Sequence, residues 1–278
     1  MHTLSELRRE LDFADLHLQK DLGQHYLIDP LVTKKMAGAC RLGPTDTVVE
    51  IGAGLGALTD LLAQRAKQVI AVEIDARIAH RLAARLAQYA NVTVACEDIL
   101  NWPWQRYRGC KVVGAIPYQI SSAILVDLCE QRPGATDAWL ALQHEVARRL
   151  VAAPGTKAYG RLPLLVQFRF QVQQLFRIPK RAFFPVPRVD SAWVHLAARA
   201  QPAVSVAHEG LLFELIKAAF GQRRKTLLNA LRTLRPALDR TSALRLLNAA
   251  GCAERVRGEE LSLAEFAAVA DALYRADK

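Results

Sequence analysis

Apolar and polar positions follow two different periods along the first half of the chain. Short runs rich in β-branched residues predict buried strands, and the longer stretches between them carry leucine and alanine at helical spacing. Strands that alternate with helices predict a parallel, doubly wound sheet with right-handed crossovers. Strands are expected at residues 47–50, 68–73, 92–95, 111–114 and 138–142, and helices at 57–65, 76–89 and 121–131.

The pattern changes in the second half. Residues 171–178 and 191–196, which a proline-rich turn separates, predict a hairpin that closes the sheet. From about residue 207 to the C-terminus the spacing is helical. We therefore expect an α/β domain over residues 1–200, with a mostly parallel Rossmann-like sheet, and a smaller all-helical domain over residues 206–278.

Composition excludes several classes of protein. The 278 residues can bury a large core, and no apolar run approaches the ~18 residues that span a bilayer. The N-terminus mixes both charge signs without an apolar stretch, so we expect no signal peptide. The five cysteines are scattered and form no C-x-x-C pair, which argues against a disulfide framework or a zinc site. We expect a cytoplasmic protein without a metal or a membrane partner.

The basic residues are unevenly distributed. The chain carries 37 Lys and Arg against 27 Asp and Glu, a formal net charge of +10. Residues 161–235 hold 13 of the basic residues and 3 of the acidic ones, so this segment accounts for the whole excess. One-sided basicity indicates an anionic partner, most often a nucleic acid, although a solvated basic face has the same composition.

A glycine-rich turn follows the first predicted strand. In "VVEIGAGLGALT", Gly52, Gly54 and Gly56 come directly after the strand and open a helix. Glycine lets a ligand lie against the backbone because no Cβ stands in the way. Such turns serve dinucleotides as well as S-adenosylmethionine, and a tight turn with nothing bound is the third interpretation.

Acidic residues end the next two strands. Glu73 in "IAVEID" is placed to accept hydrogen bonds from ribose hydroxyls, and Asp98 in "CEDIL" could accept from an adenine amino group, with Ile99 packing on the ring. An Asp at a strand end is also a common cap residue. Two acids after two strands, following the glycine turn, favour S-adenosylmethionine over NAD, because they match the arrangement of class I methyltransferases.

Several segments together resemble one family. "LGQHYLIDP", "VVEIGAGLGALT", "AVEID", "AIPYQIS", "LQHEVARRLVAAPGTKAYGRLPLLVQ", "FFPVPRVDSA" and "AFGQRRKTLLNAL" are similar to motifs of the rRNA adenine N6,N6-dimethyltransferases, over about residues 20–275. The helical C-terminal part looks more like the small-subunit (KsgA) type than the related 23S rRNA Erm resistance methyltransferases. The resemblance implies a monomer that dimethylates adenines of small-subunit (16S) rRNA, or of a pre-ribosomal small subunit, during ribosome maturation.

The resemblance also implies a set of site residues. Proline fixes the end of the fourth strand, and Tyr118 and Phe183 are expected to hold a flipped-out base between them. The implied catalytic residues are Ala115, Ile116, Pro117, Tyr118 and Phe183; the cofactor residues are His25, Leu27, Gly52, Gly54, Glu73, Ile74, Asp98, Ile99 and Ala115; the RNA-binding residues are Arg223, Arg224, Lys225, Lys180, Arg181 and Arg188.

Two positions depart from the family pattern. The family carries Asn where this chain has Ala115, and the side-chain carbonyl of that Asn accepts a hydrogen bond from adenine N6. The family also carries Asn where this chain has His25. Acceptors aimed at N6 favour a tetrahedral nitrogen whose lone pair can attack a methyl group. Three alternatives therefore stay open: an RNA-binding assembly factor with weak or lost catalysis, a methyltransferase for another RNA adenine or amine, and, more distantly, an NAD oxidoreductase.

Overall fold

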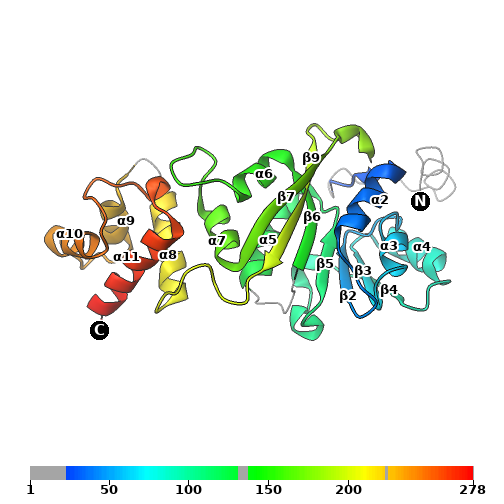
Figure 1. Cartoon of the computed structure of the whole chain (residues 1–278), viewed down its shortest axis with the longest axis horizontal. Coiled ribbons are helices and arrows are strands. Elements are labelled where there is room, and N and C mark those ends of the chain that lie inside the picture. Colours follow the sequence, from blue (N-terminus) through cyan, green and yellow to red (C-terminus); the bar gives the residue numbers. More distant parts are fainter. Residues whose placement is uncertain (1–22, 131–136, 223–224, 278) are drawn as a thin grey trace. The chain divides into compact units, whose positions relative to one another are not determined.

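The computed structural model describes residues 23–130, 137–222 and 225–277 (Figure 1). The described chain divides into two compact units. The first contains the chain up to Ala147 together with Val172–Ala198, and the second contains Arg148–Gln171 together with the chain from Arg199 onward. The sequence assigns residues 148–171 to the first domain, whereas in the structure they belong to the second unit.

A seven-stranded sheet forms the centre of the first unit. Its strands are β2 Thr47–Ile51, β3 Gln68–Glu73, β4 Val92–Cys96, β5 Lys111–Gly114, β6 Asp137–Gln143, β7 Phe170–Ile178 and β9 Ser191–Ala198. Their order in the sheet is β4-β3-β2-β5-β6-β9-β7. The pairs from β4 to β6 are parallel, and β9 is antiparallel to β6. This confirms the predicted doubly wound α/β class and places the two hairpin strands side by side.

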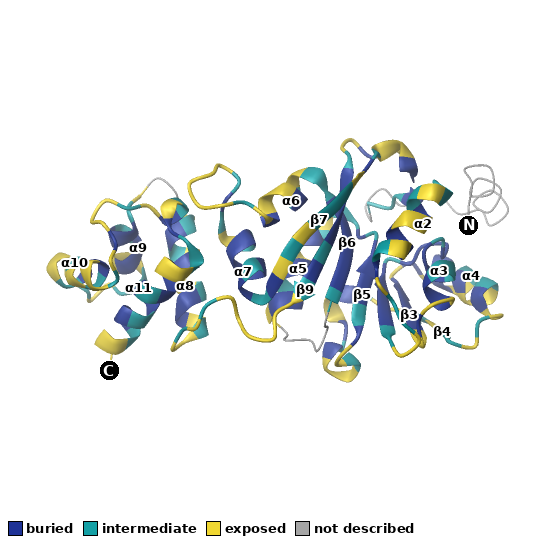
Figure 2. Cartoon of the chain, viewed as in Figure 1, coloured by how far each residue is buried: buried dark blue, intermediate teal, exposed yellow. Residues whose placement is uncertain are grey.

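The central strands are buried because helices cover the sheet on both faces, as the dark ribbons in Figure 2 show. Aspartates begin two of these helices: Asp29 accepts from Leu31 N and Val32 N, and Asp75 accepts from Arg77 N. The α-helices are α2 Pro30–Ala39, α3 Thr59–Ala63, α4 Ala76–Leu86, α5 Ser121–Glu130 and α6 His144–Leu150; the 3₁₀ turns are η2 Ile99–Asn101, η3 Trp104–Tyr107, η4 Tyr118–Ile120 and η5 Lys180–Ala182.

A second, very small sheet joins two distant segments of the first unit. Strand β1 (Tyr26–Leu27) pairs antiparallel with β8 (Phe183–Phe184), so that Tyr26 lies opposite Phe184 and Leu27 opposite Phe183. Two-residue strands carry no periodic pattern, and the sequence does not predict this pairing. It brings the "QHYL" segment to the proline-rich loop that follows β8.

The second unit is helical. Its helices are α7 Arg161–Arg169, α8 Glu209–Gly221, α9 Leu227–Leu234, α10 Arg240–Ala249 and α11 Leu263–Ala276, with the turn η6 Gly258–Glu260. Leu164 and Phe168 of α7 pack into the same core as the C-terminal helices, and the Tyr159 hydroxyl donates to the Leu261 carbonyl at 2.9 Å. These contacts explain why residues 148–171 belong to this unit. None of the described helices is long and apolar enough to cross a membrane.

Candidate active site

The carboxyl ends of three adjacent strands bring the predicted motifs together. Strand β2 lies between β3 and β5 and runs parallel to both. The glycine turn that begins at Gly52, the acid Glu73 and the residue Ala115 each come at or directly after the end of one of these strands. Parallel strands end at the same edge of a sheet, which is where α/β folds bind ligands.

The glycine turn has a backbone that other residues rarely adopt. Gly52 has φ +67° and Gly54 has φ +54°, in the left-handed region. A Cβ on Gly54 would lie 3.1 Å from the Tyr26 ring, and one on Gly52 would lie 3.8 Å from the Ala115 carbonyl oxygen. The turn therefore depends on glycine for both its conformation and its close approach to β1.

Glu73 holds this turn in place. Its carboxylate accepts hydrogen bonds from Gly54 N at 2.9 Å and from Asp75 N at 3.0 Å, one on each oxygen. The side chain is nearly inaccessible, and burial raises the pKa of its carboxyl group. Each oxygen keeps a second lone pair, so Glu73 can still accept from a ligand hydroxyl.

A pocket of about 440 Å³ lies against the glycine turn. It contains five of the predicted cofactor residues: His25, Leu27, Gly52, Gly54 and Ala115. We call it the cofactor pocket. The other residues that line it are Tyr26, Glu50, Ala53, Leu55, Ala57 and Leu58.

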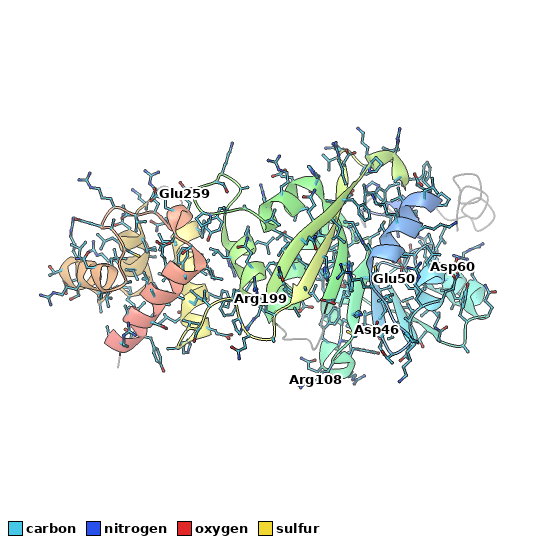
Figure 3. All side chains as sticks on the ribbon, in the orientation of Figure 1. Asp46, Glu50, Asp60, Arg108, Arg199 and Glu259 are labelled. Atoms are coloured by element: carbon cyan, nitrogen blue, oxygen red, sulfur yellow. The ribbon has the colours of Figure 1, made fainter. Side chains whose placement is uncertain are left out.

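Six residues of the cofactor pocket were not predicted from the sequence, and two of them, Glu50 and Tyr26, carry polar side-chain atoms. Glu50, labelled in Figure 3, is 2% exposed, and its Oε2 has no hydrogen-bond partner among the described residues. The Tyr26 hydroxyl is also buried without such a partner. Burial raises the pKa of Glu50 to about 8 and raises the pKa of Tyr26 as well. A carboxylate inside the apolar run "VVEI" is the signal that would have identified Glu50.

Glu73 does not line this pocket itself, and three further predicted cofactor residues also lie outside its walls. Ile74 is 50% exposed, and Ile99 is buried. Asp98 begins η2 and accepts from Leu100 N at 3.0 Å, which is the capping role considered as its alternative. All three stand at the ends of β3 and β4, which are paired along their length. They lie beside Glu73 on the same edge of the sheet, outside the walls of the cofactor pocket.

A second pocket, of about 280 Å³, contains the five predicted catalytic residues Ala115, Ile116, Pro117, Tyr118 and Phe183. We call it the target pocket. His25 and Ala115 line this pocket as well as the cofactor pocket, so the two cavities adjoin at these residues. Gly23 and Ala141 complete the lining.

The aromatic residues of the target pocket are firmly held. The Tyr118 hydroxyl is hydrogen-bonded to Ser191 Oγ at 2.7 Å, and the Tyr118 carbonyl accepts from Ser121 Oγ at 2.8 Å. Burial raises the pKa of the Tyr118 phenol. Phe183 is 3% exposed and pairs with Leu27 in the small sheet. Two fixed aromatic rings in one cavity suit a flat, stacked ligand.

The ring of His25 is anchored at one nitrogen. His25 Nδ1 lies 2.6 Å from the Pro185 carbonyl oxygen, and the ring centroid is 5.7 Å from that of Tyr118. The β1–β8 register explains the first contact, because Tyr26 faces Phe184 and His25 therefore comes beside Pro185. The imidazole is fixed at the boundary between the two pockets.

The predicted RNA-binding residues fall in both units. Lys180, Arg181 and Arg188 are exposed and flank Phe183 in the sequence, and Lys225 is exposed before α9. Arg223 and Arg224 lie outside the described residues. Within the described part of the chain, no group of three or more His, Cys, Asp or Glu side chains is placed to hold a metal ion.

The sequence matches the family described as ribosomal RNA adenine dimethylase over residues 16–271. The chain belongs to this family. The predicted family and the predicted enzyme class, a methyltransferase that uses S-adenosylmethionine, are thus confirmed.

The alignments with two relatives cover nearly the whole chain. Ribosomal RNA small subunit methyltransferase A of Anoxybacillus flavithermus is 40% identical over 283 residues, with 98% of this chain and 96% of the relative covered. The protein of the same name from Pelotomaculum thermopropionicum is 42% identical over 271 residues, with 93% and 92% covered.

Solved structures resemble this dimethylase along most of its length. The 23S rRNA methyltransferase ErmE has a TM-score of 0.68 and 30% identity, with 90% of this chain and 99% of ErmE covered. A dimethyladenosine transferase from Plasmodium falciparum has a TM-score of 0.78 and 26% identity, with 87% and 95% covered. The agreement supports the Rossmann-like fold described above.

The residues of the cofactor pocket fit S-adenosylmethionine. The turn at Gly52 and Gly54 offers backbone without Cβ atoms, and Glu73, which accepts from Gly54 N but does not line the pocket, keeps lone pairs for a ligand hydroxyl. The uncommitted Oε2 of Glu50 suits the cationic amino group or a hydroxyl of the cofactor, because a buried carboxylate oxygen without a partner is costly.

Proposed function

We propose that this chain methylates N6 of adenines in small-subunit (16S) rRNA, in the cytoplasm and as a monomer, during ribosome maturation. The observation that carries the proposal is the pair of adjoining pockets, one beside the glycine turn and one between aromatic rings. Relatives that match nearly the whole chain are named as small-subunit rRNA methyltransferases, and this supports small-subunit rRNA as the substrate.

The proposed cofactor residues fall into two groups, those at the cofactor pocket and its glycine turn and those at the neighbouring strand ends. His25, Leu27, Gly52, Gly54 and Ala115 surround the cofactor pocket, and Glu73 accepts from the ribose. When bound, S-adenosylmethionine supplies an electrophilic methyl group on a sulfonium. Ile74, Asp98 and Ile99 stand at the neighbouring strand ends, where the adenine would extend beyond the cofactor pocket.

The target pocket fits a flipped-out adenine. Tyr118 offers a ring face whose position Ser191 fixes, and Phe183 offers a second ring. Pro117 sets the backbone so that the carbonyl groups of Ala115 and Ile116 remain as acceptors. The Ala115 carbonyl oxygen lies close to the glycine turn, since a Cβ atom added to Gly52 would be 3.8 Å from it.

RNA is held mainly through its phosphates. Lys180, Arg181 and Arg188 surround the segment that carries Phe183, and Lys225, with Arg223 and Arg224, adds charge in the second unit. Basic side chains bind the backbone of double-helical RNA without reading its bases, so recognition depends on shape.

Methyl transfer from labelled cofactor to undermethylated small subunits tests this function. We expect incorporation at adenine N6, located by mapping the modified nucleotides. Incorporation into 23S rRNA alone, or into no RNA, would contradict the proposal.

A second candidate is an RNA-binding assembly factor with little catalysis. Ala115 favours it, because its methyl side chain offers no hydrogen-bond acceptor at the end of β5. Tight and selective binding to immature small subunits without methyl transfer would support this candidate, and methylation of another RNA adenine would support a changed specificity instead.

A further inference from the structure

We infer that His25 Nε2 is the side-chain acceptor for the N6 hydrogens of the target adenine, in a pocket where Ala115 supplies none. The inference rests on the proposed function, because it assigns a catalytic residue to that same site. It makes His25 part of the methyl-transfer step rather than only a cofactor contact.

The lining of the target pocket leaves few acceptors. Among the described residues that line it, only His25 and Tyr118 carry a polar atom in the side chain. The Tyr118 hydroxyl is engaged with Ser191 Oγ at 2.7 Å. His25 Nε2 has no hydrogen-bond partner among the described residues. It is therefore the uncommitted side-chain acceptor in this part of the chain.

The contact between His25 Nδ1 and the Pro185 carbonyl oxygen determines which ring nitrogen carries the proton in the neutral form. The carbonyl oxygen of Pro185 can only accept, and His25 Nδ1 lies 2.6 Å from it, so Nδ1 carries the proton of the neutral ring and donates. The neutral imidazole has one protonated nitrogen, which leaves Nε2 with a free lone pair. Of the two neutral tautomers, Pro185 thus selects the one that can accept at Nε2.

The position of His25 matches the role. The ring lines both the cofactor pocket and the target pocket, a property it shares with Ala115. A group that assists methyl transfer must stand where the two ligands meet. The β1–β8 pairing and the neighbouring Tyr118 ring hold the imidazole there, so little reorientation is needed when the base enters.

The proton balance is simple. As adenine N6 bonds to the methyl carbon, the electron pair of the carbon–sulfur bond leaves with sulfur. The new N–C bond places a positive charge on N6, and N6 loses one hydrogen as a proton. His25 Nε2 accepts this proton and becomes an imidazolium that still donates from Nδ1 to Pro185. Water then takes the proton from Nε2, which restores the neutral ring for the next turnover.

Single-turnover methylation at saturating cofactor and RNA tests the role. We expect His25→Leu to lower the rate by about 10²–10³-fold, the usual effect of one lost preorganised group. His25→Gln, which keeps an acceptor oxygen, should recover part of the rate. His80→Leu is the matched control, because His80 is an exposed histidine of α4, and its rate should equal that of the wild type. Thermal melting checks that each variant folds.

A double-mutant cycle with Ala115→Asn separates catalysis from packing. If His25 is the acceptor, an Asn at position 115 can take over its role. His25→Leu should then lower the single-turnover rate by about tenfold or less in the Ala115→Asn background. If His25→Leu lowers the rate equally in both backgrounds, His25 acts only by binding the cofactor or by maintaining the fold. Nitrogen NMR of histidine-labelled protein gives a second readout: a His25 ring protonated at Nε2 overturns the inference.

The outcomes distinguish this inference from the proposed function. An active wild type and an equally active His25→Leu variant overturn the role of His25 and leave the function intact. A wild type that transfers no methyl group to any RNA overturns both.

Discussion

The backbone N–H of Gly54 donates a 2.9 Å hydrogen bond to Glu73 Oε2. The acid proposed to hold the cofactor ribose therefore also holds the turn against which the cofactor lies. The other oxygen of Glu73 accepts from Asp75 N, which fixes the start of α4. A change at Glu73 alters the shape of the pocket as well as its charge.

Glu73→Ala should weaken S-adenosylmethionine binding by about tenfold or more, because it removes a charge-assisted acceptor and releases the turn. Isothermal titration calorimetry measures the affinity. Glu97→Ala is the matched control, since Glu97 is an exposed acid one residue after β4. If Glu73→Ala and the wild type bind equally, Glu73 lies outside the site.

Glu50 should make stability depend on pH. Burial raises its pKa from 4.5 to about 8, so between these values the folded chain keeps a proton that the unfolded chain has lost. The free energy of unfolding should therefore fall as pH rises from about 4.5 to about 8. Each unit of pKa difference corresponds to about 1.4 kcal/mol, so the change amounts to several kcal/mol.

Urea denaturation across this pH range, for the wild type and for Glu50→Gln, measures the effect. The variant cannot ionise at position 50 and should show a flatter dependence. The difference between the two curves isolates Glu50 from the other acids. Parallel curves would mean that Glu50 has the same pKa in both states.

RNA affinity should depend on charge at the loop around Phe183. Arg188→Glu should weaken binding to small-subunit rRNA at all sequences and lower the slope of log affinity against log salt by about 1. Arg108→Glu is the control: Arg108, labelled in Figure 3, is exposed and precedes β5, at the opposite end of the strands from the pockets. Equal losses in the two variants would argue for a nonspecific effect of net charge.

The second unit has its own electrostatic prediction. Reversal of Arg223, Arg224 and Lys225 should weaken RNA binding and flatten its salt dependence, while cofactor affinity stays unchanged. Filter binding at several salt concentrations measures the RNA affinity and its salt dependence. Undiminished affinity at physiological salt would show that this segment is a solvated surface.

The sequence predicts the central sheet because each strand is a short, buried run with its own signal. It predicts the glycine turn and the "AIPY" strand end for the same reason. The β1–β8 pairing escapes prediction, since two residues carry no period and the partner is more than 150 positions away. Residues 148–171 escape it too: Leu164 and Phe168 show only that a face is apolar, and the helices that cover it come later in the chain.

The candidate site divides in the same way. Strand ends and glycines predict Gly52, Gly54 and Glu73 from local pattern alone. The acid inside the apolar run "VVEI" singles out Glu50, but only the fold shows that Glu50 Oε2 and the Tyr26 hydroxyl are buried without a partner among the described residues. The anchoring of His25 by Pro185 likewise follows from the tertiary pairing of β1 with β8.

Ala115 is the position where a gain of function is expected. It lines both pockets, so an Asn side chain there would place an amide oxygen beside the reacting nitrogen. Ala115→Asn should raise the single-turnover rate by about one to three decades, the range for one preorganised acceptor. Cofactor and RNA affinity should change little, because the added hydrogen bond strengthens mainly as N6 becomes tetrahedral.

The size of the gain depends on what already assists the wild type. If His25 Nε2 accepts from N6, Ala115→Asn should raise the single-turnover rate by about one decade in the wild-type background. In the His25→Leu background the same substitution should raise it by nearly three decades, or about 10³-fold. Rapid-quench kinetics with saturating RNA measures each rate, and calorimetry confirms that the Asn variant binds cofactor normally. An unchanged rate in a folded Ala115→Asn variant would mean that an acceptor at position 115 adds nothing to the orientation of N6. A larger gain in the wild-type background than in His25→Leu would contradict the idea that the two side chains supply the same acceptor.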